Sequence, residues 1–363
     1  MMRLQSSLFV LALAAPAAGL AAPAVPAPVL APASRAAADA FFAEPALSET
    51  RAVIVYQDGR SVYERYAPGY GPGNRFVSWS MAKSITATLV GELVSDGKLA
   101  LDLPAPVPAW TKTPGDPRAK ITLRQLLNME SGLRHIESSP PEDADTNRGL
   151  FSDKSGDIAG YAVTAQLAYP PGTHWQYSTL TTHILADIVS RTIAPEARTA
   201  DQKRRAMRAF ITERLAGPAA MPSLLCEFDA AGNLLGGSLC HATARDWANF
   251  GLLYLGNGLV AGREVVSPSW VNFVRTPAPH NPGYGGQFWL NRPQPKGEPT
   301  ALFAEQGPPD AYAAIGHLGQ YVVIVPSKGL VVVRLGKTQD DVLDPVKAAV
   351  GRLVNSFPAK VAP

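Results

Sequence analysis

The sequence predicts an α+β fold, in which both ends of the chain build one antiparallel sheet flanked by helices and a mostly helical lobe is inserted between them. Strand-like runs lie at 51–66 and 320–336, whereas helical patterns fill the middle of the chain. The 363 residues are 46% hydrophobic, which is enough apolar material for a large core. We expect a sheet lobe over about 45–98 and 280–360, and a helical lobe over about 99–279.

A basic residue and then an apolar run ending in small residues open the chain. This pattern predicts a signal peptide over 1–24, cleaved after Ala21 or Ala24. The Pro/Ala-rich stretch 25–38 predicts a linker, followed by the folded domain over 39–363. The apolar run is too short and too alanine-rich to span a bilayer. We therefore expect a periplasmic or secreted protein without a transmembrane segment.

The first elements expected in the folded domain are a hairpin and a helix. Residues 51–66 read as two strands around a turn at Asp58-Gly59. The apolar stretch that follows has Ser78 as a candidate N-cap, and Gly97 predicts the end of the helix.

Three further helical patterns occupy the middle of the chain: ITLRQLLNMESGL, TLTTHILADIVSRT and TARDWANFGLLYL, the last with Thr243 as its N-cap. Pro/Gly-rich loops lie between them at 104–117 and 138–157. Near the end, QYVVIVPSKGLVVVRLG predicts two strands joined by a turn, and DPVKAAVGRLVNSF predicts an amphipathic helix.

The two cysteines, Cys226 and Cys240, flank a segment that reads as a hairpin with its turn near Gly232-Asn233. A disulfide across this hairpin would suit an oxidising compartment, and two buried free thiols are the alternative. A metal site built from both cysteines and His241 lacks an obvious fourth ligand, so we expect no metal.

Ser80 and Lys83 form the first candidate catalytic pair. On a helix, a lysine three residues after a serine lies on the same face, so its amine can reach the hydroxyl. A serine hydroxyl needs a neighbouring base to become a nucleophile, and Ser/Lys pairs at this spacing are one known solution. A second copy of the pattern, Ser95 to Lys98, straddles the predicted helix end at Gly97, so we interpret it as surface.

Tyr177 and His317 are the next candidates. Tyr177 lies where a short extended stretch meets a helix from about Thr179, a position that can aim a phenol into a cleft. A phenol beside an ammonium can have a lowered pKa and act as a base. The run His317-Leu318-Gly319 opens an apolar strand, where a glycine often marks the close approach of another group to the backbone.

The order of these motifs resembles the serine β-lactamase-like hydrolase family, in particular its class C-like branch of esterases, D-amino-acid peptidases and 6-aminohexanoate-dimer hydrolases. The motifs are Ser-x-x-Lys on a helix, Tyr-Ser-x before a helix and His-x-Gly at a C-terminal strand, and the likeness covers about residues 50–340. The resemblance implies a β-lactamase/transpeptidase-like fold. It also implies acyl-enzyme chemistry on a small ester or amide or on a short peptide, without metal or cofactor.

The resemblance implies roles for the matching residues. Ser80 would be the acylated nucleophile, Lys83 would take its proton, and Tyr177 would pass that proton to the leaving group and activate water. The main-chain N–H groups of Ser80 and Gln320 would form the oxyanion hole. The residues expected to contact the substrate are Trp79, His317, Leu318 and Gly319.

Two departures from the family pattern bear on the substrate. Thr179 stands where β-lactamases of this branch have an asparagine, and His317 and Leu318 stand where penicillin-recognising members have a lysine and a hydroxyl residue that hold the β-lactam carboxylate. We therefore expect an esterase or amidase. The alternatives are a β-lactamase, a D,D-carboxypeptidase or D-aminopeptidase, and a non-catalytic sensor on the same scaffold.

Aromatic residues near the motifs could line an apolar pocket. They are Trp79, Tyr161, Trp175, Trp289 and Tyr312.

Other classes of function find no support in the sequence. The formal net charge is +3, and the one short basic run, Lys203-Arg204-Arg205, gives no reason to expect nucleic-acid binding. The chain has no Gly-x-Ser-x-Gly and no His-Glu-x-x-His, which argues against an α/β-hydrolase elbow and a zinc protease.

Overall fold

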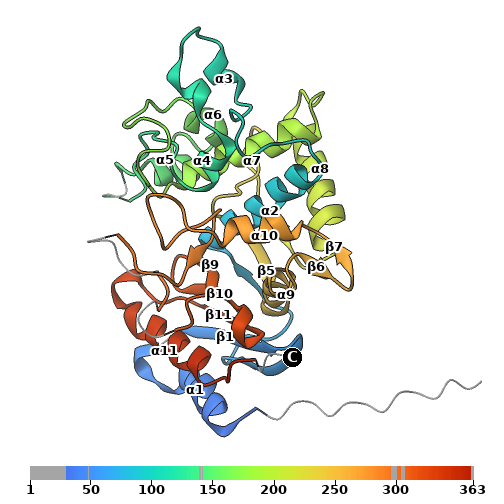
Figure 1. Cartoon of the computed structure of the whole chain (residues 1–363), viewed down its shortest axis with the longest axis vertical. Coiled ribbons are helices and arrows are strands. Elements are labelled where there is room, and N and C mark those ends of the chain that lie inside the picture. The colour runs from blue at the N-terminus through green and yellow to red at the C-terminus, as the bar shows by residue number, and fades with distance from the viewer. Residues whose placement is uncertain are drawn as a thin grey trace, which may run out of the picture.

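A six-stranded antiparallel sheet with the strand order β2-β1-β11-β10-β9-β8 organises the computed structural model (Figure 1). The structure describes residues 30–47, 49–138, 140, 142–295, 301–303 and 307–360. The strands are β1 (Thr50–Gln57), β2 (Arg60–Tyr66), β8 (Trp289–Leu290), β9 (Tyr312–Gly316), β10 (Gln320–Val325) and β11 (Leu330–Gly336). Strands β1 and β11, which come from opposite ends of the chain, are neighbours in this sheet, which confirms the predicted sheet.

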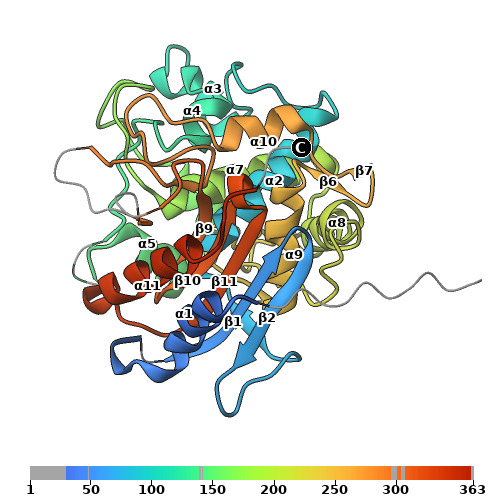
Figure 2. The ribbon, with the colours of Figure 1, turned by 60° about the horizontal axis from the view of Figure 1, so that its bottom comes forward.

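Two helices from opposite ends of the chain cover one face of this sheet. They are α1 (Pro32–Ala43) and α11 (Asp344–Asn355), which lie side by side in Figure 2. Ala38 and Phe41 of α1 are buried in a core with Val53 and Val332 of the sheet. The core between these two helices and the sheet is thus built from both ends of the chain.

The predicted linker over 25–38 is wrong in its second half, because residues 32–38 form the first part of α1. Pro32 at the start of the helix is favourable, since its missing N–H has no intrahelical partner there, and the alanines that follow have a high helix propensity. The predicted signal peptide over 1–24 lies outside the described residues.

The opposite face of the sheet is covered by α9 (Ala244–Leu255), and α2 (Ala82–Ser95) belongs to the same core, where Thr88 of α2 is hydrogen-bonded to Tyr254 of α9. Gly251 lets α9 approach the sheet, because a Cβ at this position would lie 2.5 Å from Val331 of β11. Thr243 caps α9 as predicted, accepting a hydrogen bond from the main-chain N–H of Asp246.

The inserted lobe holds most of the other helices, in the upper half of Figure 1. They are α3 (Pro108–Thr111), α4 (Leu123–Leu127), α5 (Asp145–Phe151), α6 (Ile158–Ala162), α7 (Thr179–Ile193), α8 (Ala200–Phe210) and α10 (Pro268–Val274), with a short ribbon of β6 (Leu259–Val260) and β7 (Arg263–Glu264). The helix predicted for ITLRQLLNMESGL is shorter than expected. It ends at Leu127 because Met129 takes a left-handed backbone conformation, with φ of 62°. No helix in the described ranges is both long and apolar enough to cross a bilayer.

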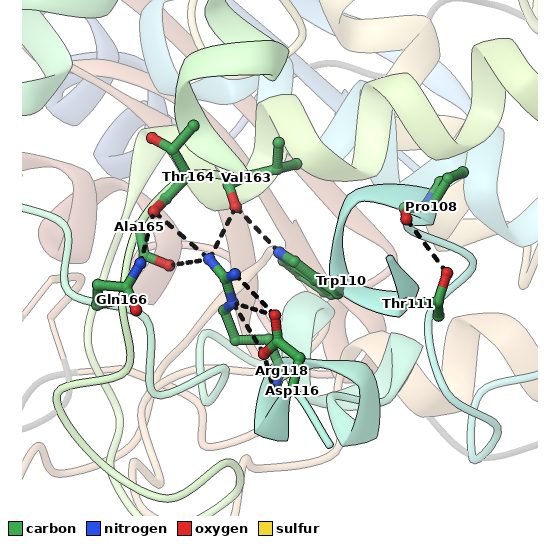
Figure 3. Close-up of polar contacts among 9 residues, drawn as sticks. All are labelled: Pro108, Trp110, Thr111, Asp116, Arg118, Val163, Thr164, Ala165 and Gln166. Atoms are coloured by element: carbon green, nitrogen blue, oxygen red, sulfur yellow. Dashed lines mark hydrogen bonds and ion pairs between the residues drawn. The ribbon is translucent and has the colours of Figure 1, made fainter. Parts of the chain in front are cut away.

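Arg118 fastens the predicted loop 104–117 to the strand-like segment after α6 (Figure 3). Its guanidinium contacts the Asp116 carboxylate at 2.7 Å and donates to the main-chain oxygen of Ala165 at 2.9 Å. The indole of Trp110 donates to the main-chain oxygen of Val163 at 3.0 Å. The loop is therefore held by directed hydrogen bonds, and the segment it holds leads on toward Tyr177.

A small three-stranded sheet joins the two lobes, with the order β3 (Arg75–Val77), β5 (Cys240–Thr243) and β4 (Leu225–Cys226). Cys226 and Cys240 are cross-strand partners in β4 and β5 and form a disulfide. This confirms the disulfide and removes the metal alternative, since neither cysteine remains available as a thiolate ligand.

Removing this disulfide is expected to destabilise the protein by about 3 kcal/mol, the value that chain entropy gives for a loop of this length. The comparison is the thermal midpoint of Cys226→Ser/Cys240→Ser against the wild type, both under non-reducing conditions. The wild type in a thiol reductant should fall to the midpoint of the double variant. An unchanged midpoint in both experiments would show that the bridge contributes nothing.

Candidate active site

Ser80 lies in a 3₁₀ turn over Trp79–Met81 that leads directly into α2. Ser78 stands at the N-cap position of this turn as predicted, but its side chain makes no capping hydrogen bond. The buried Ser78 hydroxyl instead shares its hydrogen between the main-chain oxygens of Trp79, at 2.8 Å, and Ser238, at 3.1 Å, and accepts from the N–H of Cys240 at 3.0 Å. Ser78 thus anchors the turn that carries Ser80 to the segment closed by the disulfide. The second Ser-x-x-Lys copy is on the surface as predicted, since α2 ends at Ser95 and Lys98 is exposed.

Lys83 is held by three acceptors, one of which is Ser80. Its Nζ lies 3.0 Å from Ser80 Oγ, 2.8 Å from Thr179 Oγ1 and 2.8 Å from the main-chain oxygen of Gly237. The side chain is 1% exposed, and this burial lowers the pKa of Lys83 to about 8, although the Glu137 carboxylate partly opposes the shift. A lysine with this pKa has an appreciable neutral fraction near neutral pH, so it can accept a proton.

Tyr177 completes the predicted triad. Its phenol is hydrogen-bonded to Ser80, and Lys83 Nζ lies 4.8 Å from the centre of its ring. The expectation of a lowered phenol pKa is wrong. Burial raises the pKa of Tyr177 well above its usual range, and the negative charge of Glu137 acts in the same direction. Tyr177 is therefore a neutral phenol beside Ser80, suited to relaying a proton.

Glu137 and Thr179 are the parts of the site that sequence reasoning missed. The Thr179 hydroxyl donates to Glu137 Oε1 at 2.5 Å, and the Thr179 main-chain N–H donates to Glu137 Oε2 at 2.6 Å. Thr146 also donates to Oε2, at 2.7 Å. For Thr179 the sequence held a signal, since a threonine stands where the family pattern has an asparagine. Glu137 gave none, because it lies 42 residues away in a loop.

The strand edge beside Ser80 is formed by Ile315, Gly316 and His317 at the end of β9. A Cβ on Gly316 would lie 2.1 Å from the main-chain oxygen of Ser78, so only glycine allows this approach. The ring of His317 meets the ring of Trp79 edge to face at 5.3 Å. The predicted contacts of Trp79 and His317 with the cavity are confirmed, and Gly316 is the glycine of close approach.

Leu318, Gly319 and Gln320 do not line the cavity, which corrects three predicted site residues. Leu318 and Gly319, with φ of 61° and 78°, form the turn that leads from β9 into β10. The hairpin register pairs Gln320 with Gly316, so the main chain of Gln320 faces the partner strand. The Gln320 side chain instead donates to the carbonyl oxygens of His317 and Leu318, each at 3.1 Å, and holds the turn.

A cavity of about 540 Å³ opens beside Ser80. Trp79 and Trp289 line it, and Trp289 stacks on Tyr177 with 5.5 Å between the ring centres. The other predicted aromatic residues do not reach it. Trp175 packs behind Trp289 at 6.1 Å, and Tyr161 and Tyr312 bond to Asp145 and to the main chain of Tyr254. The charged side chains on the cavity wall are Glu137 and Lys347.

A family model described as Beta-lactamase matches residues 48–355. This chain belongs to the β-lactamase family. The β-lactamase-family resemblance inferred from the Ser80, Lys83 and Tyr177 motifs is thereby confirmed, as is the β-lactamase/transpeptidase-like fold.

Relatives within the β-lactamase family include the 6-aminohexanoate-dimer hydrolase of Paenarthrobacter ureafaciens, which is 28% identical over 233 residues. The match covers 62% of this chain and 57% of the relative, so the chain spans little more than half of that protein's length. A solved structure from Bacillus anthracis, provisionally named a 6-aminohexanoate-dimer hydrolase, gives a TM-score of 0.67 at 23% identity, covering 85% of this chain and 81% of the other. A family VIII carboxylesterase gives a TM-score of 0.65 at 17% identity, covering 91% and 98%. These two structures show the shared fold.

Proposed function

We propose that this protein is a serine hydrolase that cleaves ester or amide bonds through an acyl-enzyme on Ser80. The observation that carries the proposal is the 3.0 Å contact between Lys83 Nζ and Ser80 Oγ at the wall of an open cavity. A nucleophile within hydrogen-bond reach of a base with a pKa near the working pH is the arrangement that acyl transfer requires. The names of the relatives, a dimer hydrolase and a carboxylesterase, agree with this chemistry.

The reaction begins when Ser80 Oγ attacks the substrate carbonyl and its proton passes to neutral Lys83. The main-chain N–H of Ser80, in the first turn before α2, stabilises the oxyanion that forms. A second donor comes from the strand edge. The main-chain N–H of Asn291 donates to the main-chain oxygen of Ala311, so Ala311 faces away from β10. Because the direction of the main-chain groups alternates along a strand, the odd-numbered residues from Ala311 through β9 to His317 share this direction, which is the side of the cavity. We assign the second oxyanion donor to His317 in place of Gln320.

Collapse of the tetrahedral intermediate breaks the bond between the carbonyl carbon and the leaving oxygen or nitrogen. The leaving group takes a proton through Tyr177, which is hydrogen-bonded to Ser80. Water then attacks the acyl-enzyme, Lys83 and Tyr177 accept its proton as a coupled system, and Ser80 leaves with its hydroxyl restored.

The cavity wall favours neutral substrates over β-lactams. At the strand edge, Ile315 and Gly316 offer no charged or hydroxyl side chain for a carboxylate. Glu137 and Lys347 on the cavity wall carry opposite charges, so the wall offers no net positive charge to an anionic substrate. The test compares hydrolysis of p-nitrophenyl butyrate, a linear 6-aminohexanoate dimer and a chromogenic cephalosporin. Ester or amide turnover with little cephalosporin turnover supports the proposal. Efficient cephalosporin turnover would identify a β-lactamase, and inertness toward all three would favour a sensor or a narrow peptidase.

The pH profile follows from the pKa of Lys83. Because only neutral Lys83 accepts the Ser80 proton, kcat/KM for p-nitrophenyl butyrate is expected to rise with pH and level off above about 8, the pKa of Lys83. Initial rates between pH 6 and 10, corrected for spontaneous hydrolysis, give this profile. A rate that stays flat or falls between pH 6 and 9 would contradict the role of Lys83 as the base.

We also propose that the protein is exported. The support is the signal-peptide pattern over 1–24 and the disulfide between Cys226 and Cys240, which suits an oxidising compartment. Mass spectrometry of the mature protein from its native host should show a new N-terminus after Ala21 or Ala24. A full-length protein in the cytoplasm would disprove export.

A further inference from the structure

We propose that Glu137 is a positioning residue that acts through Thr179 to turn the lone pair of Lys83 toward Ser80. This inference rests on the proposed function, since it concerns how the base of that reaction is aligned. It is carried by the direction of the hydrogen bonds that join these four side chains.

The direction of the first bond is fixed by chemistry. A carboxylate can only accept, and a threonine hydroxyl has one hydrogen. Because the Thr179 hydroxyl lies 2.5 Å from Glu137 Oε1, its hydrogen points to Glu137. Toward Lys83, which is 2.8 Å away on the other side, Thr179 can therefore only accept.

The second neighbour of Lys83 is also restricted to accepting. The main-chain oxygen of Gly237, 2.8 Å from Lys83 Nζ, is a carbonyl and has no hydrogen to give. Once Lys83 is neutral, its amine has two N–H groups and one lone pair. Thr179 and Gly237 accept the two N–H groups, so the lone pair faces the remaining neighbour, Ser80 Oγ, at 3.0 Å. This is the orientation that a general base requires.

The same argument explains the residue at position 179. An asparagine side chain would offer a carbonyl oxygen, which accepts without help. A threonine hydroxyl is an unambiguous acceptor only while its hydrogen is taken, and Glu137 takes it. The carboxylate is held in place by two further donors, the main-chain N–H of Thr179 and the hydroxyl of Thr146.

Glu137 also acts on Lys83 through its charge, which raises the pKa of the lysine against the effect of burial. Other titratable groups surround the pair. Burial and the charge of Lys83 lower the pKa of His183 to about 3, and burial raises the pKa of Tyr177 well above its usual range, so neither changes charge between pH 6 and 9. The other ionisable side chains on the cavity wall, among the described residues, are His317, Tyr321 and Lys347.

Glu137→Gln is the decisive variant because it keeps the shape and reverses a hydrogen bond. The amide oxygen is expected to stay with the two donors at the Oε2 position, which places the NH₂ group against the Thr179 hydroxyl. The Thr179 hydroxyl then accepts a hydrogen bond from the introduced amide and donates one to Lys83 Nζ. The lone pair of the neutral lysine amine is thereby taken up by Thr179 and no longer faces Ser80. For p-nitrophenyl butyrate hydrolysis, the plateau of kcat/KM at high pH is expected to fall about tenfold or more. The acidic limb of the pH profile of kcat/KM should move to lower pH, because the loss of a negative charge near Lys83 lowers the pKa of the lysine.

Variants of Thr179 show whether Glu137 acts through it. Thr179→Val is expected to lower the plateau as Glu137→Gln does, whereas Thr179→Ser, which keeps the hydroxyl, should stay within about threefold of the wild type. The double variant Glu137→Gln/Thr179→Val should be no slower than the slower single variant. Glu64→Gln is the control for charge, since Glu64 pairs with Arg245 outside the cavity, and it should leave both rate and profile unchanged.

The inference is overturned if Glu137→Gln keeps the wild-type plateau and limb, or if the losses of the two single variants multiply in the double variant. If Glu137→Gln does not fold, Thr179→Val against Thr179→Ser decides, and equal rates for these two overturn the inference. Ser80→Ala is measured alongside. Full turnover by Ser80→Ala would defeat the proposed function itself, whereas an inactive Ser80→Ala with a wild-type Glu137→Gln defeats only the role of Glu137.

Discussion

Ser80→Ala is expected to lower the turnover of p-nitrophenyl butyrate by about 10⁴-fold or more, since removing a nucleophile leaves only binding and oxyanion stabilisation. The fold should persist, because the partners of the Ser80 hydroxyl among the described residues, Lys83 and Tyr177, both belong to the site. The measurement is initial-rate kinetics on purified protein, with the thermal midpoint recorded as a check on folding.

The chain supplies a matched control for this experiment. Ser95 begins the second Ser-x-x-Lys copy and lies at the end of α2, away from the cavity. Ser95→Ala should keep wild-type turnover. If Ser80→Ala retained a tenth of wild-type activity while Ser95→Ala lost activity, Ser80 would not be the nucleophile.

Lys83→Met is expected to cause the second-largest loss, about 10³-fold in kcat, because the proton of Ser80 would have no acceptor of suitable pKa. Methionine has a similar length and suits a buried position, so the fold should survive. Lys83→Arg should be equally inactive, since a guanidinium stays protonated and cannot serve as a base.

Lys98→Met, in the surface copy of the motif, is the matched control and should leave turnover unchanged. Lys98 is exposed and forms an ion pair with Asp96. Activity of Lys83→Arg within about tenfold of the wild type would contradict the assignment, because it would mean that a permanent positive charge suffices.

Local patterns in the sequence predicted much of the fold and half of the site. The β1–β2 hairpin, the turn between β10 and β11 and the Thr243 cap depend on residues close together in the chain, so they could be predicted. The Ser80–Lys83 pair was predictable for the same reason, since three residues on a helix fix which face two side chains share.

The third motif was misplaced because two glycines stand three residues apart. Gly316 and Gly319 are equivalent in the sequence pattern, and only the strand register decides which of them meets the turn that carries Ser80. β9 ends at Gly316, beside Ser78, whereas Gly319 belongs to the turn and faces Arg334. Register depends on pairing between distant strands, which a single sequence does not display.

Two further errors came from burial and distance. Position beside an ammonium suggested a lowered pKa for the Tyr177 phenol, but complete burial has the larger effect and raises it. Glu137 reaches Thr179 only because the fold brings a loop and the start of α7 together, so no spacing in the chain indicated the contact.

The most direct test of the account is to observe the acyl-enzyme itself. Wild-type protein is mixed with p-nitrophenyl butyrate, quenched in acid during turnover and analysed by intact-mass and peptide mass spectrometry, with Ser80→Ala treated in parallel. The account predicts a gain of one butyryl group, located on the peptide that contains Ser80 and absent from the variant. Turnover with no adduct on the quenched enzyme, or an adduct on another residue that persists in Ser80→Ala, would contradict it.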